Sequence, residues 1–267
     1  AQDFDHTPAE KTLVELFPDH WGFSVRISGR GSIPTVGACT GRVIAMPAPD
    51  PDRGGAGKFN WAVVLRHEYT HTVTLSATGN RIPHWFTEAC AVWEQPDRRN
   101  YQAVSLLVGA VRNRKFYPIK ELSWGFIRQD RRRGPASRSL AYAQAEWVFE
   151  YIVEKKNYDA IGKMLKGFRD GWTQEKVFKD VLGMTEPEFD KDFHAWAKKE
   201  IVSWGFDTDP RPSFAAASKA AKAKPTSADA QADLAYALLR RPRGLKQAIA
   251  TARKALKIDP KHPRALA

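Results

Sequence analysis

The order of apolar and polar residues divides the chain into a short region of strands followed by a long helical region. Residues 23–29 (Phe-Ser-Val-Arg-Ile-Ser-Gly) alternate apolar and polar side chains, which is the period of a half-buried strand that ends at a glycine. Residues 42–46 form a second short apolar stretch, closed by Pro47 and the turn-rich run 49–57. Two such strands predict a small antiparallel sheet near the N-terminus.

Helical signals begin at residue 60. Asn60 is a typical N-cap residue, and the segment after it is predicted as a helix over 61–75 that ends before Gly79. Pro83 suits the first turn of the next helix, which reaches about Glu94. The remaining pattern predicts amphipathic helices over 101–111, 139–155, 158–167, 173–181 and 186–203. Together these elements predict one mainly helical α+β domain over residues 1–205.

The composition of the chain changes after this domain. Residues 206–224 are rich in Pro, Ala, Ser and Lys, which predicts a linker or a weak helix. Residues 225–267 hold two further helical stretches, 228–239 and 245–258, closed by Asp259-Pro260. We expect this segment to form a C-terminal α-hairpin.

The hairpin resembles a tetratricopeptide repeat. Ala248, Ala255 and Pro260 match the small and proline positions of the second helix of such a repeat, and Leu234-Ala235 resembles the Leu-Gly of its first helix. The turn between the helices is about one residue longer than in the common repeat. The resemblance implies a surface for a protein partner and, beyond Lys261, further repeats. An alanine-rich hairpin of another kind is the alternative.

Charge and length limit the classes of partner. The formal net charge is +12, and basic residues cluster at 112–115, 128–133 and 240–243. A nucleic-acid reader would combine such clusters with stacking aromatics or a known motif, which the sequence lacks, so nucleic acid is not an expected partner. No stretch approaches the 18 apolar residues of a transmembrane helix.

Compartment and cysteine state are less constrained. The chain begins at Ala1 without an initiator Met, which is consistent with a removed signal peptide or with an upstream domain. A periplasmic or secreted location is slightly favoured over the others. Cys39 and Cys90 form no Cys-x-x-Cys pattern, and both one disulfide and two free thiols stay open.

The chemistry of the chain is concentrated in His67-Glu68-Tyr69-Thr70-His71. Residues four apart lie on one face of a helix, so His67 and His71 can present two imidazole nitrogens to one metal ion. Neutral imidazole suits zinc, and Glu68 is placed to take a proton from a zinc-activated water. The alternative is a pair of helix histidines satisfied by ordinary hydrogen bonds.

A second acidic residue follows on the next predicted helix. Glu88 lies among the apolar residues of the segment 82–94. An acidic side chain on such a helix is rarely buried unless it is paired or bound to metal. This placement indicates that Glu88 is either paired or bound to metal.

Together the two segments resemble the peptidase MA-like gluzincins, a group distantly related to thermolysin. The second signature of the group, Pro-x-Trp-x-x-Glu-Gly-x-Ala-x-aromatic with an apolar residue after the Trp, is matched by Pro83, Trp85, Phe86, Glu88, Ala91 and Trp93. Ala89 replaces the usual Gly, and the interval between His71 and Glu88 is shorter than in thermolysin-like enzymes. The resemblance implies that Glu88 is the third zinc ligand.

The resemblance also implies a tyrosine that donates a hydrogen bond to the developing oxyanion. Tyr142 is the candidate for this role, and a tyrosine buried between helices is the alternative. His84 is expected either near the zinc or at the rim of the site. Arg66 is expected to pair with a carboxylate such as Glu94, and Cys90 to serve packing.

These observations predict a zinc metallopeptidase that hydrolyses a peptide or protein substrate. Zn²⁺ held by His67, His71 and Glu88 would be the cofactor, with Glu68 as general base. The competing hypothesis is a repeat-type protein-binding scaffold with a structural or inactive zinc site. Such a site would close its fourth position, for example with His84 or Cys90.

Overall fold

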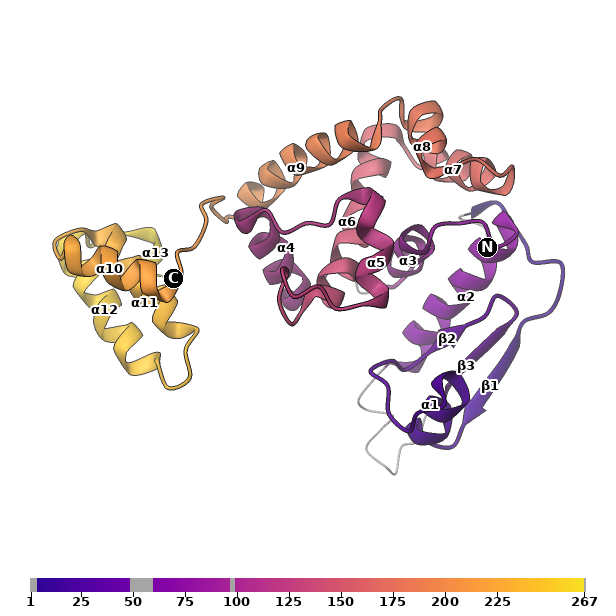
Figure 1. Ribbon diagram of the computed structural model, residues 1–267, viewed down its shortest axis with the longest axis horizontal. Coiled ribbons are helices and arrows are strands. Elements are labelled where there is room, and N and C mark those ends of the chain that lie inside the picture. Colours follow the sequence, from indigo (N-terminus) through magenta and orange to yellow (C-terminus); the bar gives the residue numbers. More distant parts are fainter. Residues whose placement is uncertain (1–3, 49–59, 97–98, 267) are drawn as a thin grey trace. The chain divides into compact units, whose positions relative to one another are not determined.

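The chain forms two compact units, with unit 1 ending at Phe206 and unit 2 beginning at Asp207. The structure, a computed structural model, describes residues 4–48, 60–96 and 99–266 (Figure 1). The turn-rich run predicted over 49–57 lies outside the described residues.

The sheet of unit 1 has three strands in the order β1-β3-β2. β1 (Leu13–Phe17) pairs in parallel with β3 (Val43–Pro47), and β2 (Ala38–Cys39) pairs with β3 in the antiparallel sense. The predicted antiparallel sheet is therefore wrong, because the described sheet is mixed. Since β2 runs opposite to β3, it returns the chain along the sheet, and β3 then runs in the same direction as β1.

That connecting helix, α1 (His20–Ser28), occupies the segment predicted as a strand over 23–29. Asp19 caps its N-terminus by accepting a hydrogen bond from Gly22 N, and Gly29 ends it in the left-handed conformation with φ of 70°. Phe23 is buried, whereas Val25 and Ile27 are exposed, so the alternating apolar residues do not share a buried face. The local caps therefore favour a helix here, although the alternation of apolar and polar residues predicts a strand.

Helices α1 and α2 pack on opposite faces of the sheet. Phe17 contacts Phe23 of α1, which places the odd-numbered face of β1 against that helix. Side chains alternate along a strand, so Val14 and its β3 partner Ile44 lie on the other face, toward α2 (Trp61–Thr78). The sheet therefore supports one side of α2.

Helices α2 and α3 (His84–Trp93) follow one another closely in the chain. Asn60 caps α2 by accepting from Ala62 N and Val63 N, which confirms its expected role. Gly79 and Asn80 both have positive φ and turn the chain toward Pro83, after which α3 begins. The other α-helices described in unit 1 are α4 (Tyr101–Asn113), α5 (Leu122–Ile127), α6 (Ser137–Lys156), α7 (Asp159–Arg169), α8 (Gln174–Val177) and α9 (Glu186–Ser203).

The core of unit 1 is centred on α3 and α6, which pack on each other. Its largest fully buried side chains include Trp85 of α3 and Trp147 and Tyr151 of α6. One predicted helix differs in form: residues 173–181 contain the short α8 followed by a π-helical turn, Phe178–Leu182. The core holds α3 rigidly, so a side chain on its α2-facing surface has a fixed position.

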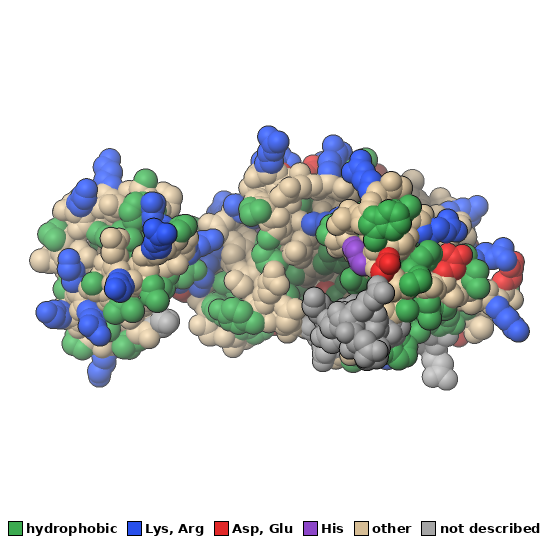
Figure 2. Space-filling view, turned by 90° about the horizontal axis from the view of Figure 1, so that it is seen from below, with side chains coloured by type: hydrophobic (Ala, Val, Ile, Leu, Met, Phe, Trp, Pro, Cys, Tyr) green, Lys and Arg blue, Asp and Glu red, His purple; other side chains and the backbone are tan. Residues whose placement is uncertain are grey.

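Unit 2 is helical throughout its described regular elements, and Lys and Arg side chains project from the face of it that Figure 2 shows. It contains α10 (Phe214–Ala223), α11 (Ala228–Leu239), α12 (Leu245–Ile258) and the short α13 (Pro263–Leu266). Residues 206–224, predicted as a linker or weak helix, thus include α10, which is capped by Ser213 and packs on α11. Small buried residues such as Ala248 and Ala255 bring α12 close to α11. Among the described residues of the whole chain, no helix has the length and apolar character needed to cross a membrane.

Candidate metal centre

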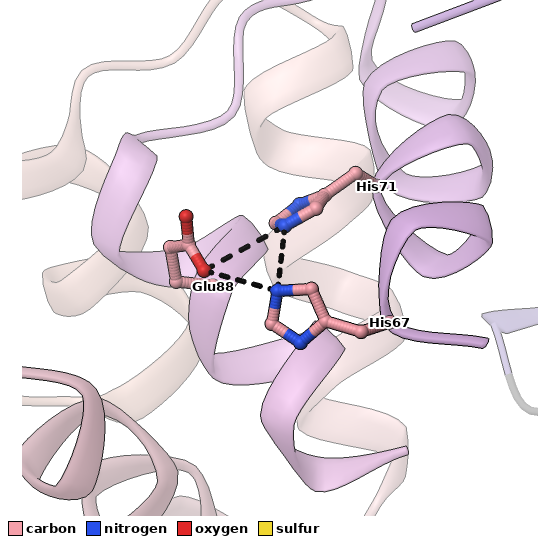
Figure 3. Close-up of side chains that lie close together, drawn as sticks. All are labelled: His67, His71 and Glu88. Atoms are coloured by element: carbon pink, nitrogen blue, oxygen red, sulfur yellow. Dashed lines mark hydrogen bonds and ion pairs between the residues drawn. The ribbon is translucent and has the colours of Figure 1, made fainter. Parts of the chain in front are cut away.

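Three side chains predicted as ligands meet between α2 and α3. His67 and His71 project from adjacent turns of α2, and Glu88 faces them from α3 (Figure 3). The two Nε2 atoms lie 3.2 Å apart, and Glu88 Oε2 lies 3.4 Å from His67 Nε2 and 3.6 Å from His71 Nε2. The described residues contain one group of metal-ligating side chains of this kind, and it consists of these three.

The donor set fits a metal ion. Glu88 Oε2 is buried and has no hydrogen-bond partner among the described residues, although two imidazole nitrogens face it. A buried carboxylate oxygen without a hydrogen bond is costly unless a cation lies close to it. Two imidazoles and one carboxylate are the protein ligands of many catalytic zinc sites. The arrangement therefore suits zinc with a further coordination position left open.

The two candidate histidine ligands each contact a further side chain through Nδ1. His71 Nδ1 lies 2.8 Å from Thr87 Oγ1, and His67 Nδ1 lies 2.8 Å from the Gln95 amide. Such outer contacts orient metal-binding imidazoles and fix which nitrogen faces the metal. Burial raises the pKa of the Glu88 carboxyl, but the neighbouring histidines outweigh burial and hold that pKa below its usual range. Glu88 is therefore ionised when it faces them.

Glu68, the predicted general base, lies on α2 next to His67 and is buried. Burial raises the pKa of its carboxyl; His67 and His71 oppose this shift, and the charge of Glu88 adds to it. The net direction is upward, toward the range in which a carboxylate exchanges protons readily near neutral pH.

Gly37, immediately before β2, lies against Glu68. A Cβ added at residue 37 would stand 2.5 Å from Glu68 Oε1 and 2.8 Å from Val64 Cγ1. Glycine therefore allows the backbone to approach the carboxylate closely.

Tyr142, the predicted oxyanion donor, is half-buried on α6 with its ring edge against Phe126 at a centroid distance of 4.8 Å. Burial raises the pKa of its hydroxyl, and the charges of Glu88 and Glu68 raise it further. The phenol stays protonated at neutral pH and keeps a hydrogen that it can donate.

The remaining sequence candidates have distinct positions. His84 Nε2 lies 3.1 Å from Glu88 Oε1, the oxygen directed away from the other histidines, and its ring packs on Phe126. Arg66 donates to Glu94 at 2.8 Å, which confirms the expected pair. Cys39 and Cys90 are free thiols, and Cys90 is fully buried.

A groove of about 940 Å³ lies on a different side of α2 from the candidate ligands. Its α2 lining includes Trp61, Leu65 and Tyr69, spaced four apart, and the sheet contributes Val14 and Ile44. Because each step of four residues is about one helical turn, these three residues share one face of α2. His67 and His71 project from another face. The groove is therefore separate from the metal centre.

Sequence reasoning missed Gly37, Thr87 and Gln95. Gly37 is far from the motif in the chain, and only the packing of β2 on α2 brings it to Glu68. Thr87 had a usable signal, because it immediately precedes Glu88 on an otherwise apolar helix. Gln95 lies just past the end of α3 and had none that we can identify.

The fold is mainly helical, and the candidate site combines two imidazoles and one carboxylate that could hold a metal ion. The family model described as Peptidase MA superfamily matches residues 55–199, more than half of the chain. The chain therefore belongs to the Peptidase MA superfamily, and a peptidase-like domain contains the candidate site. No curated protein and no solved structure matches the chain.

Proposed function

We propose that unit 1 is a zinc-dependent peptidase of the gluzincin type. One observation carries the proposal: Glu88 Oε2 is buried without a hydrogen bond and faces two imidazole nitrogens, at 3.4 and 3.6 Å, beside the buried Glu68. A site built only for packing would not leave a carboxylate oxygen in this state. Membership in the Peptidase MA superfamily supports the same class of reaction.

In this proposal His67, His71 and Glu88 hold the zinc. The bound ion supplies a Lewis acid that activates water and polarises the scissile carbonyl. Glu68 accepts the proton of the attacking water on its carboxylate and transfers it to the departing amine. The upward direction of the Glu68 pKa suits a group that must both take and release this proton.

Tyr142 would donate its phenolic hydrogen to the oxyanion that develops on the carbonyl. The hydroxyl is protonated at neutral pH, as that of an ordinary tyrosine is, and its raised pKa leaves this unchanged. Hydrogen bonds directed at a developing oxyanion are worth about 3 to 4 kcal/mol in other hydrolases.

The edge of the sheet supports a peptide as substrate. β2 is at one edge of the sheet in the order β1-β3-β2. Gly37, just before β2, lies against the Glu68 side chain. An extended peptide can pair its backbone with such an edge and present a peptide bond to the neighbouring site. The substrate would then be recognised mainly through its backbone.

The second candidate function is a protein-binding scaffold. Its support is in unit 2, where the large apolar side chains Leu245 and Ile249 are exposed four residues apart on α12. A tetratricopeptide-like hairpin would use such a face for a protein partner. A scaffold with a structural zinc would need a fourth protein ligand, and the described metal-ligating group has three members. We therefore favour the peptidase.

The test replaces Glu68 with Gln in the full chain. The variant should keep its zinc and lose at least about 100-fold in hydrolysis of a fluorescent casein, because the general base is removed while the ligands remain. Glu175→Gln, on the exposed α8, is the matched control. Hydrolysis by Glu68→Gln at the wild-type rate would exclude Glu68 as the base.

A further inference from the structure

The two histidines of the metal centre are held by different kinds of partner. His71 Nδ1 faces the hydroxyl of Thr87, and His67 Nδ1 faces the amide of Gln95. A hydroxyl carries one proton, whereas an amide offers donors on one side and an acceptor on the other. The hydrogen-bond roles around His71 can therefore be deduced by following the hydroxyl protons.

Thr74 lies on α2, one turn beyond Thr70. Thr74 Oγ1 lies 3.0 Å from the carbonyl oxygen of Thr70 and 3.3 Å from that of His71. A carbonyl oxygen only accepts, so the single hydroxyl proton of Thr74 is donated there. Thr70 and Thr78 make the same kind of bond, to the carbonyl oxygens of Arg66 and Thr74.

Thr87 comes next in the series. Its Oγ1 lies 2.8 Å from Thr74 Oγ1, whose proton is already used, so Thr87 must be the donor in this pair. Having donated its one proton to Thr74, Thr87 can only accept from His71 Nδ1 at 2.8 Å. His71 therefore carries a proton on Nδ1, and in the neutral ring Nε2 keeps its lone pair.

Burial makes this series of bonds decisive. Thr74 and Thr87 are buried, as is His71, so water does not compete for their hydrogen bonds. A reversed series would place the Thr74 oxygen against two carbonyl oxygens with no proton between them, which is costly in a buried position. His67 differs, because rotation of the Gln95 amide lets its Nδ1 either accept or donate.

We propose that Thr87 and Thr74 are positioning residues that fix His71 in its Nδ1–H tautomer before any metal binds. Nε2 of His71 is then already available as a ligand, whereas His67 adopts its tautomer when the ion arrives. The proposal rests on the proposed zinc site for its purpose. The tautomer itself is a property of the metal-free protein.

The experiment measures two-bond ¹H–¹⁵N correlations of the histidine rings in the full metal-free chain. At about pH 9, where free imidazole is neutral, His71 should show the Nδ1–H tautomer in the wild type and in Thr87→Ser. Thr87→Val, which keeps the shape but removes the hydroxyl, should leave a mixture of tautomers. Thr78→Val is the matched control, because Thr78 donates to the main-chain oxygen of Thr74 and not to the Thr74 hydroxyl, which is the group that contacts Thr87.

Zinc titration of the same four proteins gives the second readout. Thr87→Val should bind zinc roughly 10- to 100-fold more weakly than the wild type, the usual effect of losing an outer partner of a metal ligand. Thr87→Ser and Thr78→Val should bind as the wild type does. An Nε2–H tautomer of His71 in the wild type, or wild-type tautomer and affinity in Thr87→Val, overturns the proposal. Failure of the wild type to bind zinc overturns the proposed function instead.

Discussion

Two pairs of consecutive helices in this chain pack through contacts of opposite polarity. Where α2 meets α3 in unit 1, the contact contains Thr74, Thr87 and the charged Glu88, all buried. Where α11 meets α12 in unit 2, the contact contains small apolar residues such as Ala235, Ala248 and Ala255. The first pair buries groups that lose stability unless each finds a partner, whereas the second buries mainly methyl groups that need none, and its buried Thr251 bonds within α12 to Gln247 O.

The difference shows where the chain gives up stability for chemistry. In the α2–α3 contact every hydroxyl has a partner, and the carboxylate oxygen that lacks one faces the two imidazoles. In unit 2 the turn between α11 and α12 is set by backbone fit, since a Cβ at Gly244 would stand 2.0 Å from the carbonyl oxygen of Leu238. Substitutions should therefore affect metal and activity in one pair and folding in the other.

The largest effect is expected for Glu88→Ala. This change removes one of three ligands and leaves the two histidines without their anionic neighbour. We expect zinc to be lost on dialysis and casein hydrolysis to fall to background, measured by elemental analysis and by the fluorescent assay. Glu175→Gln serves again as the control, and retention of zinc by Glu88→Ala would remove Glu88 from the ligand set.

Overpacking of the alanine contact should come second. Ala255→Leu adds a large side chain at a fully buried position of α12, and we expect the local stability of unit 2 to fall by about 1 to 3 kcal/mol. Hydrogen exchange of the full chain would measure it as faster exchange in α11 and α12. Ala250→Leu, at an exposed position of the same helix, should change little. Equal protection in both variants would mean that α12 does not pack as described.

Gly37→Ala should reduce hydrolysis while zinc is kept. The added Cβ would meet Glu68 Oε1 and Val64, so the carboxylate must move from its position. A displacement of about 1 Å in a catalytic group costs on the order of 10- to 100-fold in rate. Gly162→Ala is the control, because nothing lies within 4 Å of a Cβ at that exposed helical position. A variant with the wild-type rate would show that Glu68 tolerates the shift.

The smallest expected effect concerns Asp190, a partly buried carboxylate of α9 outside the site. Burial raises its pKa to about 6, although its Oδ1 accepts a hydrogen bond from Ile119 N and the nearby Glu186 adds to the rise. A carboxyl with a raised folded-state pKa favours folding most below its usual pKa of about 3.9, and that contribution is lost as pH rises through 6.

Asp190→Asn should therefore stabilise the chain at pH 8 and not at pH 4. With allowance for solvent screening, the gain is on the order of 1 kcal/mol, visible in thermal unfolding midpoints. The amide keeps an oxygen for Ile119 N. The opposite order, with a gain at pH 4 alone, would contradict the assigned direction of the pKa.

Much of the helical part of the fold could be predicted from the sequence, and its reasons are local. Helix α9 begins as predicted because Thr185 and Glu188 form a capping box, and α11 and α12 have the predicted bounds. The strand predicted over 23–29 is wrong for a local reason, the caps at Asp19 and Gly29, whereas the error in the sheet concerns partners that are distant in the chain. β1 was missed because its residues show no alternation and its pairing with β3 is non-local, and Leu13 and Leu16 are exposed.

The candidate site divides in the same way. The three proposed ligands could be predicted from the sequence, because helical spacing identifies His67 and His71 and the second signature identifies Glu88. The structure places the three side chains together. Gly37 and Gln95 reach the site only through packing of β2 and the end of α3. The direction of the hydrogen bonds from His71 through Thr87 to Thr74 follows from side-chain geometry, which no sequence pattern contains.

The most direct test of the account is zinc content per chain in the wild type, Glu68→Gln and His71→Ala, measured by elemental analysis after exhaustive dialysis. The account predicts about one zinc in the first two proteins and almost none in His71→Ala, because Glu68 is the proposed base and His71 a proposed ligand. Equal zinc in all three, or none in the wild type, would contradict it.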